Sequence, residues 1–408
     1  MGRRILYLSQ WFWPEPVTRG LKVAYDLKAR GYEVEVLTGF PNYPAGKLAE
    51  GYRLAPYRRE EIEGVTIHRV FLYPSHDRSS LGRALNYLSF FVSALLFCLF
   101  RSGRFDLIYV YHPPITTGLV AALLGFVRRK PFILEVQDLW PDSVAASGMS
   151  ATGLLARILN PICRFVYRRA ALVLGQSSGM TSRLIERGVN SERADVIFNW
   201  ADEDAAQPNG LYDTDLLNFG GRFNFVYAGN LGIVQELEVL VEAAHSLVDV
   251  APHIQLTLIG EGAERNRLET LVRERGVRNV QIRPGVSPSY IGDVLAAADV
   301  LVVHLKNDPL FEITIPSKTQ FYLAMGRPIL MAVSGEAARV VTQSKAGLCV
   351  QPGDVEAVAS TMLRMANLPQ AELRKMGLEG RKAYDERFSF RTTMDRIAHH
   401  IDRLINAT

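Results

Sequence analysis

A single lysine follows a proline and a serine at the expected start of a helix within residues 312–328. No further proline or glycine occurs between Pro316 and Gly326, so the pattern predicts a helix that begins near Ser317 and ends at that glycine. The start of a helix presents free N–H groups and a partial positive charge, which suit a phosphate. Lys318 would add a full cation there. On spacing alone, an ordinary capped helix accounts for this stretch equally well.

Short apolar runs alternate with helical segments along the whole chain. Runs that are apolar on both faces and separated by helices are typical of parallel sheets covered on both sides. In the first half the runs are Ile5–Ser9, Glu33–Leu37, Val65–Leu72, Leu107–Tyr111, Phe132–Val136, Leu172–Gly175 and Val196–Phe198, and in the second half they are Asn224–Ala228, Gln255–Ile259, Val280–Arg283, Val300–His304 and Pro328–Ala332. Such sheets bind ligands in the loops after the carboxyl ends of their strands.

A polar, turn-rich segment over 199–222 separates the two halves. It contains several acidic residues, a proline and three glycines, as linkers do, and a new strand is expected from Phe223. We therefore expect an α/β protein of two Rossmann-like domains that face each other across a cleft. The first domain would cover residues 1–205 and the second residues 206–384.

Composition and charge exclude several classes of protein. The 408 residues are 48% hydrophobic and 22% charged, which is typical of globular domains with buried cores. The net charge of +4, without zinc-finger spacing or an aromatic-interleaved basic run, argues against a nucleic-acid partner. The three cysteines fit no disulfide framework or metal site, and the N-terminus lacks the apolar core of a signal peptide. We expect a protein that faces the cytoplasm.

Five motifs carry a family resemblance that extends over nearly the whole chain. In one-letter code they read LSQWFWPEPVTRG over 8–20, VEVLTGFPNYPAG over 34–46, LEVQDLWPD over 134–142, YAGNLGIVQ over 227–235 and TIPSK over 314–318. In this order they resemble family 4 glycosyltransferases of the GT-B fold. Within that family, the chain is most similar to the bacterial L-fucosamine (UDP-L-FucNAc) transferases of polysaccharide assembly.

The resemblance implies a reaction and its partners. The donor would be a UDP-activated N-acetyl-deoxyhexosamine, and the acceptor a polyprenyl-diphosphate-linked saccharide of O-antigen, capsule or exopolysaccharide assembly. We identify no Asp-x-Asp motif of the kind that holds a divalent ion, so we expect a metal-independent enzyme without a cofactor. The resemblance also implies that the first domain binds the acceptor, that the second binds the nucleotide sugar, and that a terminal helix over 385–408 packs back on the first domain.

The resemblance assigns the donor-binding groups, and here the chain departs from its relatives. The arginine and lysine that usually grip the diphosphate are replaced by Asn230 and Gln235, so Lys318 is expected to supply the missing charge. The position of the carboxylate that usually holds the ribose falls on Phe321 or on Gln320, depending on the count, so this carboxylate is absent or is replaced by the Gln320 amide. The donor-binding residues implied are Gly20, Asn230, Gln235, Gly260, Gly262, Pro284, Val286, Glu312, Thr314, Ile315, Pro316, Ser317 and Gln320.

Three residues are candidates for the chemistry itself. Lys318 would stabilise the leaving diphosphate. Asp138 follows a predicted strand, where a loop of the active site is expected, and a carboxylate with a raised pKa would suit a general base. Glu15 in the first loop is the competing base, and a helix cap is the structural alternative for Asp138. The sequence does not decide between the two carboxylates.

Residues 84–100 contain no charged side chain and are flanked by arginines. As a helix they span roughly 25 Å, short of the ~30 Å hydrocarbon core of a bilayer. We expect a helix that lies partly sunk in the cytoplasmic face of the bacterial inner membrane, and a buried core helix is the alternative. The side chains expected to meet lipid are Tyr87, Phe90, Phe91, Leu95 and Leu96.

A second class of function stays open at this point. The same fold hosts nucleotide-sugar epimerases, and a non-catalytic nucleotide-sugar-binding protein would carry the same loops. Conversion of a UDP-sugar without an acceptor, or binding without transfer, would favour that class.

Overall fold

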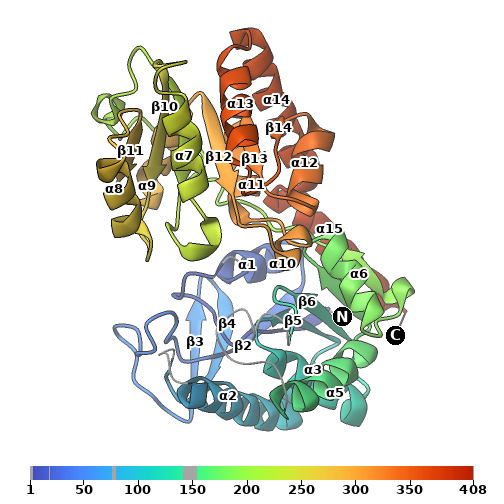
Figure 1. Ribbon diagram of the computed structural model, residues 1–408. Coiled ribbons are helices and arrows are strands. Elements are labelled where there is room, and N and C mark those ends of the chain that lie inside the picture. The colour runs from blue at the N-terminus through green and yellow to red at the C-terminus, as the bar shows by residue number, and fades with distance from the viewer. Residues whose placement is uncertain (1–2, 18, 76–79, 141–153, 408) are drawn as a thin grey trace. The chain divides into compact units, whose positions relative to one another are not determined.

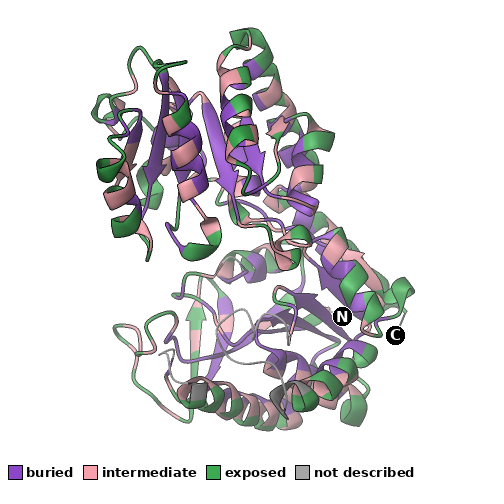
Figure 2. Cartoon of the chain, in the orientation of Figure 1, coloured by how far each residue is buried: buried purple, intermediate pink, exposed green. Residues whose placement is uncertain are grey.

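The computed structural model describes residues 3–17, 19–75, 80–140 and 154–407. The chain divides into two compact units, Met1–Ile197 with Met394–Thr408, and Phe198–Thr393 (Figure 1). Each unit has a mainly parallel sheet whose central strands are buried between helices (Figure 2). The predicted pair of Rossmann-like α/β domains is confirmed.

The N-terminal unit alternates strands and helices. Its strands are β1 (Arg4–Leu8), β2 (Glu33–Gly39), β3 (Tyr57–Ile62), β4 (Val65–Val70), β5 (Leu107–His112), β6 (Phe132–Val136), β7 (Leu172–Gly175) and β8 (Ala194–Val196). Its helices are α1 (Leu21–Ala29), α2 (Ser80–Arg101), η1 (Ser102–Arg104), α3 (Ile115–Arg128), α5 (Leu154–Arg169), α6 (Ser178–Glu186), η2 (Ser191–Arg193) and most of α15 (Phe390–Asn406).

The order of strands in this sheet locates its ligand-binding edge. The order is β3-β4-β2-β1-β5-β6-β7-β8, and every pair is parallel except β3 with β4. The connections run outward in opposite directions from β1 and β5. The loops after these two strands therefore flank the topological switch point, where α/β sheets bind ligands.

The C-terminal unit repeats this construction. Its strands are β9 (Phe223–Ala228), β10 (Ile254–Ile259), β11 (Val280–Arg283), β12 (Val300–His304), β13 (Ile329–Ala332) and β14 (Gly347–Cys349). Its helices are η3 (Thr214–Leu217), η4 (Ile233–Gln235), α7 (Glu238–Ser246), α8 (Arg265–Glu274), α9 (Pro288–Ala296), α10 (Pro309–Glu312), α11 (Ser317–Met325), α12 (Glu336–Ser344), α13 (Val355–Ala366) and α14 (Gln370–Arg387).

The second sheet also has a switch point, between β9 and β12. Its order is β11-β10-β9-β12-β13-β14, and all of its pairs are parallel. This is the strand order of dinucleotide-binding Rossmann folds. Ligand-binding groups are therefore expected in the loops that begin at Gly229, after β9, and at Leu305, after β12.

The sequence missed two edge strands and placed the unit boundaries differently. Strand β3 has a largely charged sequence and pairs only with β4, and β14 is three residues long, so neither has an apolar run. The first unit ends at Ile197 and not at residue 205, because Phe198 and Trp200 pack against Phe388 and Phe390. The terminal helix begins at Phe390, and the residues that rejoin the first unit begin at Met394.

Three helices form one layer of the N-terminal unit. Helices α2 and α5 both lie against α3, along the lower edge of this unit in Figure 1. Helix α2 has 22 residues, α3 has 14 and α5 has 16, and none of these residues is Asp or Glu. A surface layer without carboxylates is unusual for a protein with 42 acidic residues.

Candidate functional site

Lys318 lies against the backbone that follows β9. Gly229 has a φ of +138°, and a Cβ added there would lie 2.5 Å from the Cε atom of Lys318 and 2.6 Å from its Nζ atom. The ammonium also lies 4.8 Å from the centroid of the Tyr227 ring. Burial lowers the pKa of Lys318 from 10.5 to about 8. The structure thus holds a partly desolvated cation at the switch point between β9 and β12.

Glycines also bring the next loop close to this cation. A Cβ at Gly260 would lie 1.8 Å from the carbonyl oxygen of Gly229, and one at Gly262 would lie 2.2 Å from that of Leu231. Neither position can carry a side chain without moving the backbone. The loops after β9 and β10 therefore form one closely packed backbone surface beside Lys318.

The segment after β11 joins the same edge of the sheet. The Gly260 N–H donates to the Arg283 carbonyl at 3.1 Å, and the Gly285 N–H donates to the Glu261 carboxylate at 3.3 Å. Pro284 and Val286, which the resemblance assigns to the donor site, flank Gly285 in this segment. The structure brings them to the loop that contains Gly260 and Gly262.

Asn230 and Gln235 belong to the loop that begins at Gly229. The Asn230 amide donates to Gln235 Oε1 at 3.4 Å, and both side chains keep contact with solvent. The Gln235 carbonyl lies 2.7 Å from Nδ1 of the buried His304, the last residue of β12. Burial lowers the pKa of His304, so a neutral ring holds this loop in place. The two amides stand in the loop beside Lys318 as hydrogen-bonding groups without charge.

The start of α11 matches the predicted anion site. Ser317 is the first helical residue, Pro316 is the N-cap, and no side chain caps the helix. The Thr319 N–H donates to the Pro316 carbonyl at 2.8 Å, so the N–H groups that a ligand could meet next to the Lys318 side chain are those of Ser317 and Lys318. Glu312 is exposed at the end of α10, and Gly335 packs against its backbone.

Three other residues predicted around this helix differ in exposure. Thr314 keeps partial contact with solvent, whereas Ile315 is buried, so Ile315 has only backbone groups to offer a ligand. The side chain of Gln320 is 1% exposed. The prediction that the Gln320 amide replaces the ribose-binding carboxylate is therefore wrong for the described structure, because α11 turns that side chain into the interior.

In the N-terminal unit, Glu15 is a structural clamp. One of its carboxylate oxygens accepts the N–H groups of Asn42 and Tyr43 at 2.8 and 2.7 Å, and the other accepts the N–H of Phe12 at 2.8 Å. Burial raises the pKa of Glu15 while these three N–H groups lower it. Because both oxygens hold loop backbone together, this geometry favours Asp138 over Glu15 as a base.

Asp138 follows β6 at the carboxyl edge of the same sheet. Its side chain reaches solvent, and desolvation by its surroundings raises the pKa of its carboxyl group. The next residues turn back, with the Trp140 N–H donating to the Asp138 carbonyl at 3.0 Å. Gly20 is the N-cap of α1, in the loop after β1. The structure thus places Gly20 and Asp138 on loops at one edge of the N-terminal sheet.

Helix α2 differs in its orientation from the prediction. Its buried stripe consists of Asn86, Phe90, Ala94 and Cys98, and Phe90 is 0% exposed, so the prediction that Phe90 meets lipid is wrong. Tyr87 is half-buried, with its ring edge-on to Trp140, while Phe91 and Leu95 are half-buried and Leu96 is exposed. The exposed stripe is apolar and consists of Leu81, Leu85, Leu88, Val92, Leu96 and Phe100, each between 44% and 87% exposed.

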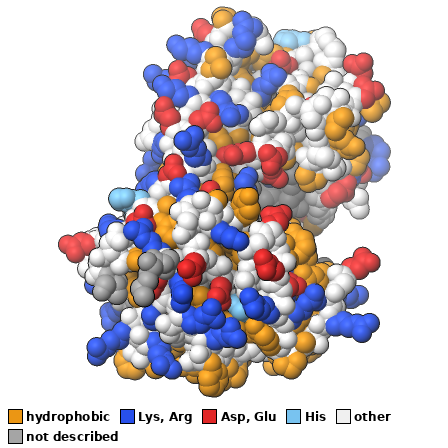
Figure 3. Space-filling view, turned by 180° about the vertical axis from the view of Figure 1, so that it is seen from behind, with side chains coloured by type: hydrophobic (Ala, Val, Ile, Leu, Met, Phe, Trp, Pro, Cys, Tyr) orange, Lys and Arg blue, Asp and Glu red, His pale blue; other side chains and the backbone are white. Residues whose placement is uncertain are grey.

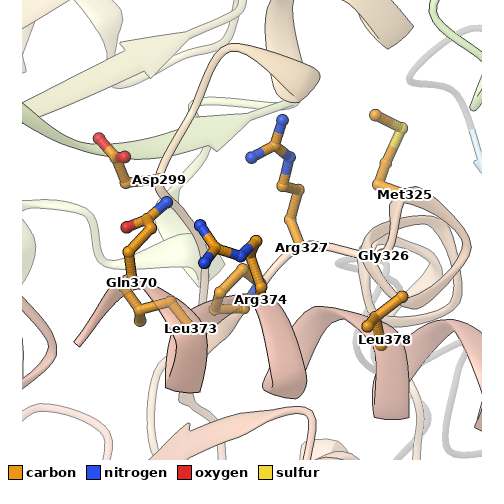
Figure 4. Close-up of a pocket in the computed structure, with 9 residues that line it drawn as sticks. Asp299, Met325, Gly326, Arg327, Gln370, Leu373, Arg374 and Leu378 are labelled. Carbon is orange, nitrogen blue, oxygen red and sulfur yellow. The ribbon is translucent and has the colours of Figure 1, made fainter. Parts of the chain in front are cut away.

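A pocket of about 340 Å³ lies at the other edge of the C-terminal sheet. It is lined by Asp299 and Arg327, which precede β12 and β13, and by Gln370 and Arg374 at the start of α14 (Figure 4). Arg327 donates to the Ala296 carbonyl. Because this pocket opens at the amino ends of the strands, it does not belong to the site around Lys318.

Among the described residues, no three His, Cys, Asp or Glu side chains are grouped closely enough to hold a metal ion. Two runs have Asp-x-Asp spacing, 202–204 and 213–215. The Asp202 carboxylate accepts the Ala205 N–H at 3.2 Å, and the Asp213 carboxylate accepts the Asp215 N–H at 3.1 Å and so caps η3. Independence of metal stays a prediction.

Two family models match the two halves of the chain. The Glycosyl transferase 4-like domain matches residues 16–200, and Glycosyl transferases group 1 matches residues 222–367. A curated relative, "Putative colanic acid biosynthesis glycosyl transferase WcaI" of Escherichia coli K12, is 29% identical over 357 residues, which are 84% of this chain and 86% of the relative.

Solved structures show the same architecture. HepE of Anabaena in complex with UDP superposes with a TM-score of 0.72 at 17% identity, over 98% of this chain and 100% of that chain. Sucrose-phosphate synthase of Thermosynechococcus elongatus superposes with a TM-score of 0.74 at 19% identity, over the whole of both chains. At these identities the likeness establishes the fold.

Proposed function

We propose that this chain, a GT-B glycosyltransferase with a glycosyl transferase 4-like domain followed by a group 1 domain, takes its sugar from a UDP-sugar. The acceptor would be a polyprenyl-diphosphate-linked saccharide, and the product would serve polysaccharide assembly. An N-acetyl-deoxyhexosamine such as L-FucNAc is the sugar we propose, on the resemblance of the sequence motifs.

The observation that carries this proposal is the position of Lys318. A half-buried ammonium lies beside Gly229 and the uncapped start of α11. Burial lowers the pKa of Lys318 because it destabilises the charged form. A bound anion stabilises that charged form and offsets the free energy lost on desolvation. A diphosphate offers two such charges. The solved HepE structure with UDP supports a uridine nucleotide as the donor.

The reaction can be written with named groups on each side. The bond between the sugar C1 and the diphosphate oxygen breaks, and a bond from C1 to the acceptor oxygen forms. Lys318 and the N–H groups of α11 would stabilise the negative charge that develops on the diphosphate. The acceptor hydroxyl loses its proton to Asp138, whose raised pKa makes it a stronger base than an ordinary carboxylate.

A single substitution tests the donor site. Lys318→Ala should weaken the binding of UDP in titration calorimetry about tenfold or more, because a charge-assisted hydrogen bond contributes roughly 1.5–3 kcal/mol. Lys345→Ala is the control, since Lys345 ends α12 at the amino edge of the sheet. Equal affinities of the two variants would remove Lys318 from the site.

The helical layer without carboxylates supports a membrane-bound location. The exposed stripe of α2 continues to Phe126 and Val127 at the end of α3 and to Ile158 on α5, which are 50–60% exposed. In Figure 3 hydrophobic side chains line the lower edge of the N-terminal unit, with Lys and Arg side chains near them. The cations on these three helices and directly after α2 and α3 are Arg83, Arg101, Arg104, Arg128, Arg129, Lys130, Arg157, Arg164, Arg168 and Arg169. Such a surface suits anionic headgroups around a shallow apolar contact.

The helix itself fits a surface contact better than a crossing. Helix α2 has 22 residues, about 33 Å at 1.5 Å per residue, and within it Leu81–Arg101 is apolar and long enough to span a bilayer. Its buried stripe of Asn86, Phe90, Ala94 and Cys98 nevertheless packs on the protein. We therefore propose that the enzyme lies on the cytoplasmic face of the inner membrane with one side of α2 in the headgroup region.

Vesicle sedimentation tests this location. The full chain should bind vesicles that contain about 30% phosphatidylglycerol and release from them as salt is raised, because the cations act through a screened field. Pure phosphatidylcholine vesicles should bind it less. Equal recovery in the supernatant with and without anionic vesicles would contradict the proposal.

A further inference from the structure

The largest fully buried side chains of the described residues are two arginines of the N-terminal unit, Arg19 and Arg69. Arg19 pairs with Glu135, with 2.5 Å between Arg19 Nε and Glu135 Oε1, and their side chains are 0% and 2% exposed. Removing two charges from water is costly, and two apolar side chains of similar volume are often at least as stable. The stability of the fold alone therefore does not explain this pair.

The two partners belong to different loops of the candidate site. Arg19 immediately precedes Gly20 in the loop after β1. Glu135 lies on β6, and its Oε1 accepts from the Gln137 amide at 2.7 Å, directly before Asp138. One ion pair therefore ties the loop that contains Gly20 to the loop that contains Asp138.

The strand between them, β5, takes part in the same network. The Tyr109 hydroxyl donates to the second oxygen of Glu135, and the Tyr7 hydroxyl donates to the Arg19 carbonyl at 2.5 Å. The rings of Tyr7 and Tyr109 stack with 5.6 Å between centroids. Three adjacent strands, β1, β5 and β6, thus fix the side chain and the backbone of Arg19.

We propose that Arg19 and Glu135 are positioning residues, which set the spacing of the Gly20 loop and the Asp138 loop. Neither group reaches solvent, so neither would touch a substrate. The pair sets the position of the Gly20 backbone, after β1, relative to the Asp138 carboxylate, after β6. The predicted effect of this pair on catalysis rests on the proposed function, because Asp138 is the base in that proposal.

A double substitution separates positioning from stability. Arg19→Met or Glu135→Gln alone leaves a buried group unpaired and should lower the melting temperature by roughly 6–20 °C. Arg19→Met with Glu135→Gln removes both charges; the new amide keeps an acceptor oxygen for Gln137, and its NH2 group can donate to the Tyr109 hydroxyl oxygen. The melting temperature of this double variant should therefore return to within a few degrees of the wild type. The matched control is Arg396→Met with Asp195→Asn, an ion pair of 3.2 Å in the same unit between α15 and β8.

The four tryptophans provide a readout that needs no substrate. Trp11, Trp13 and Trp140 lie on the two loops, whereas Trp200 lies in the other unit. In ¹⁹F NMR of the 5-fluorotryptophan protein, the double variant should shift or broaden the three loop signals and leave the fourth unchanged. The control pair should leave all four unchanged. Loop signals identical to the wild type would overturn the proposal.

Two further measurements keep the test decisive. If the double variant does not fold, Arg19→Lys keeps the charge but loses the planar fork of donors, and unchanged loop signals in that variant would equally overturn the proposal. Where the wild type transfers sugar, the double variant should lose kcat by roughly tenfold to a hundredfold. The NMR result does not depend on transfer, so failure of the proposed function and failure of this inference are distinguishable.

Discussion

At the scale of single residues, the absence of a side chain at Gly229 leaves room for the ammonium of Lys318. Gly229 leaves space that a methyl group would take from Lys318, and the loops at Gly260 and Gly262 depend on the same absence of side chains. With the family's charged pair replaced by Asn230 and Gln235, Lys318 is the cation that lies against Gly229. The affinity for a diphosphate should therefore depend strongly on this one side chain.

The lowered pKa of Lys318 predicts how UDP binding depends on pH. Burial lowers that pKa to about 8, and a diphosphate binds the charged form, so binding requires uptake of a proton above pH 8. The dissociation constant measured by calorimetry should be nearly constant from about pH 7 to 8 and then rise about tenfold per pH unit. Lys318→Arg should abolish this rise, because a guanidinium stays charged. A rise of the same size in that variant would assign the titration to another group.

The same pKa predicts a dependence of stability on pH with a definite sign. The folded state releases the proton of Lys318 near pH 8, whereas the unfolded chain holds it to about 10.4. The cost of burying the ammonium is therefore present below pH 8 and is relieved as pH rises toward 10. Relative to Lys318→Met, the wild type without ligand should gain stability over this window in urea unfolding. A parallel pH dependence of the two proteins would contradict the burial of a charged Lys318.

Gly229→Ala tests the space that this cation occupies. The added Cβ should displace the ammonium and weaken UDP binding about tenfold, comparable to one charge-assisted contact. Gly276→Ala is the control, because Gly276 also has a positive φ, +60°, but open space around it. Both changes should cost about 1 kcal/mol of stability through backbone strain, and the loss of affinity should belong to Gly229 alone. Equal UDP affinities would refute the steric explanation.

Only some of the candidate site residues could be predicted from the sequence. Lys318 and the glycines at 260 and 262 were found because a proline, a serine or a preceding strand marks their loops. Gly229 was overlooked, since a glycine after a strand is common and only the fold shows what stands against it. Gln320 was misassigned because a count of residues does not show which way a helix turns its side chains.

At the scale of elements, α2 has two contrasting faces. Asn86 on the buried face donates to the Tyr73 carbonyl at 2.7 Å and to Asn42 at 3.2 Å, and it accepts from Gln10 at 2.6 Å. The helix is thereby fixed to the loops after β1, β2 and β4. The opposite face presents the apolar stripe to solvent, so the proposed membrane contact would lie on the helix that holds these three loops.

A pair of substitutions on this stripe tests its role. Leu88→Ser with Val92→Ser should weaken binding to anionic vesicles roughly tenfold or more, since each half-exposed aliphatic side chain contributes on the order of 1 kcal/mol when it is buried. Leu378→Ser on α14 is the matched control, because Leu378 is 71% exposed on a helix of the other unit. Unchanged vesicle binding of the double variant would exclude the stripe as the contact.

The length and apolar character of this helix were predictable, but its rotation was not. Seventeen uncharged residues at 84–100 provide few polar positions that could show which face is buried. The structure buries Asn86 and Phe90 together, one turn apart, and the polar and apolar positions therefore do not separate by face. Edge strands were missed for a related reason, because β3 has no apolar run to signal it.

At the scale of the whole molecule, the chain passes between its two units twice, after Ile197 and before Met394. The second passage lies within α15, whose C-terminal part is anchored in the N-terminal unit. Tyr32 donates to Asp402 at 2.6 Å, and His400 lies 2.8 Å from Asp195. The two-domain plan followed from the alternation of strands and helices, whereas the position of these passages depended on aromatic contacts that no periodicity reveals.

The most direct test of the enzyme's function is release of UDP in the presence of both substrates. The full chain would be incubated with a panel of UDP-N-acetyl-deoxyhexosamines, including UDP-L-FucNAc, with and without polyprenyl-diphosphate-linked saccharides in vesicles. We predict that UDP appears together with the extended lipid-linked saccharide, only when both substrates are present, and at least about tenfold more slowly with Lys318→Ala. Conversion of a UDP-sugar without acceptor, or binding of UDP-sugars without transfer to any acceptor of the panel, would contradict the account.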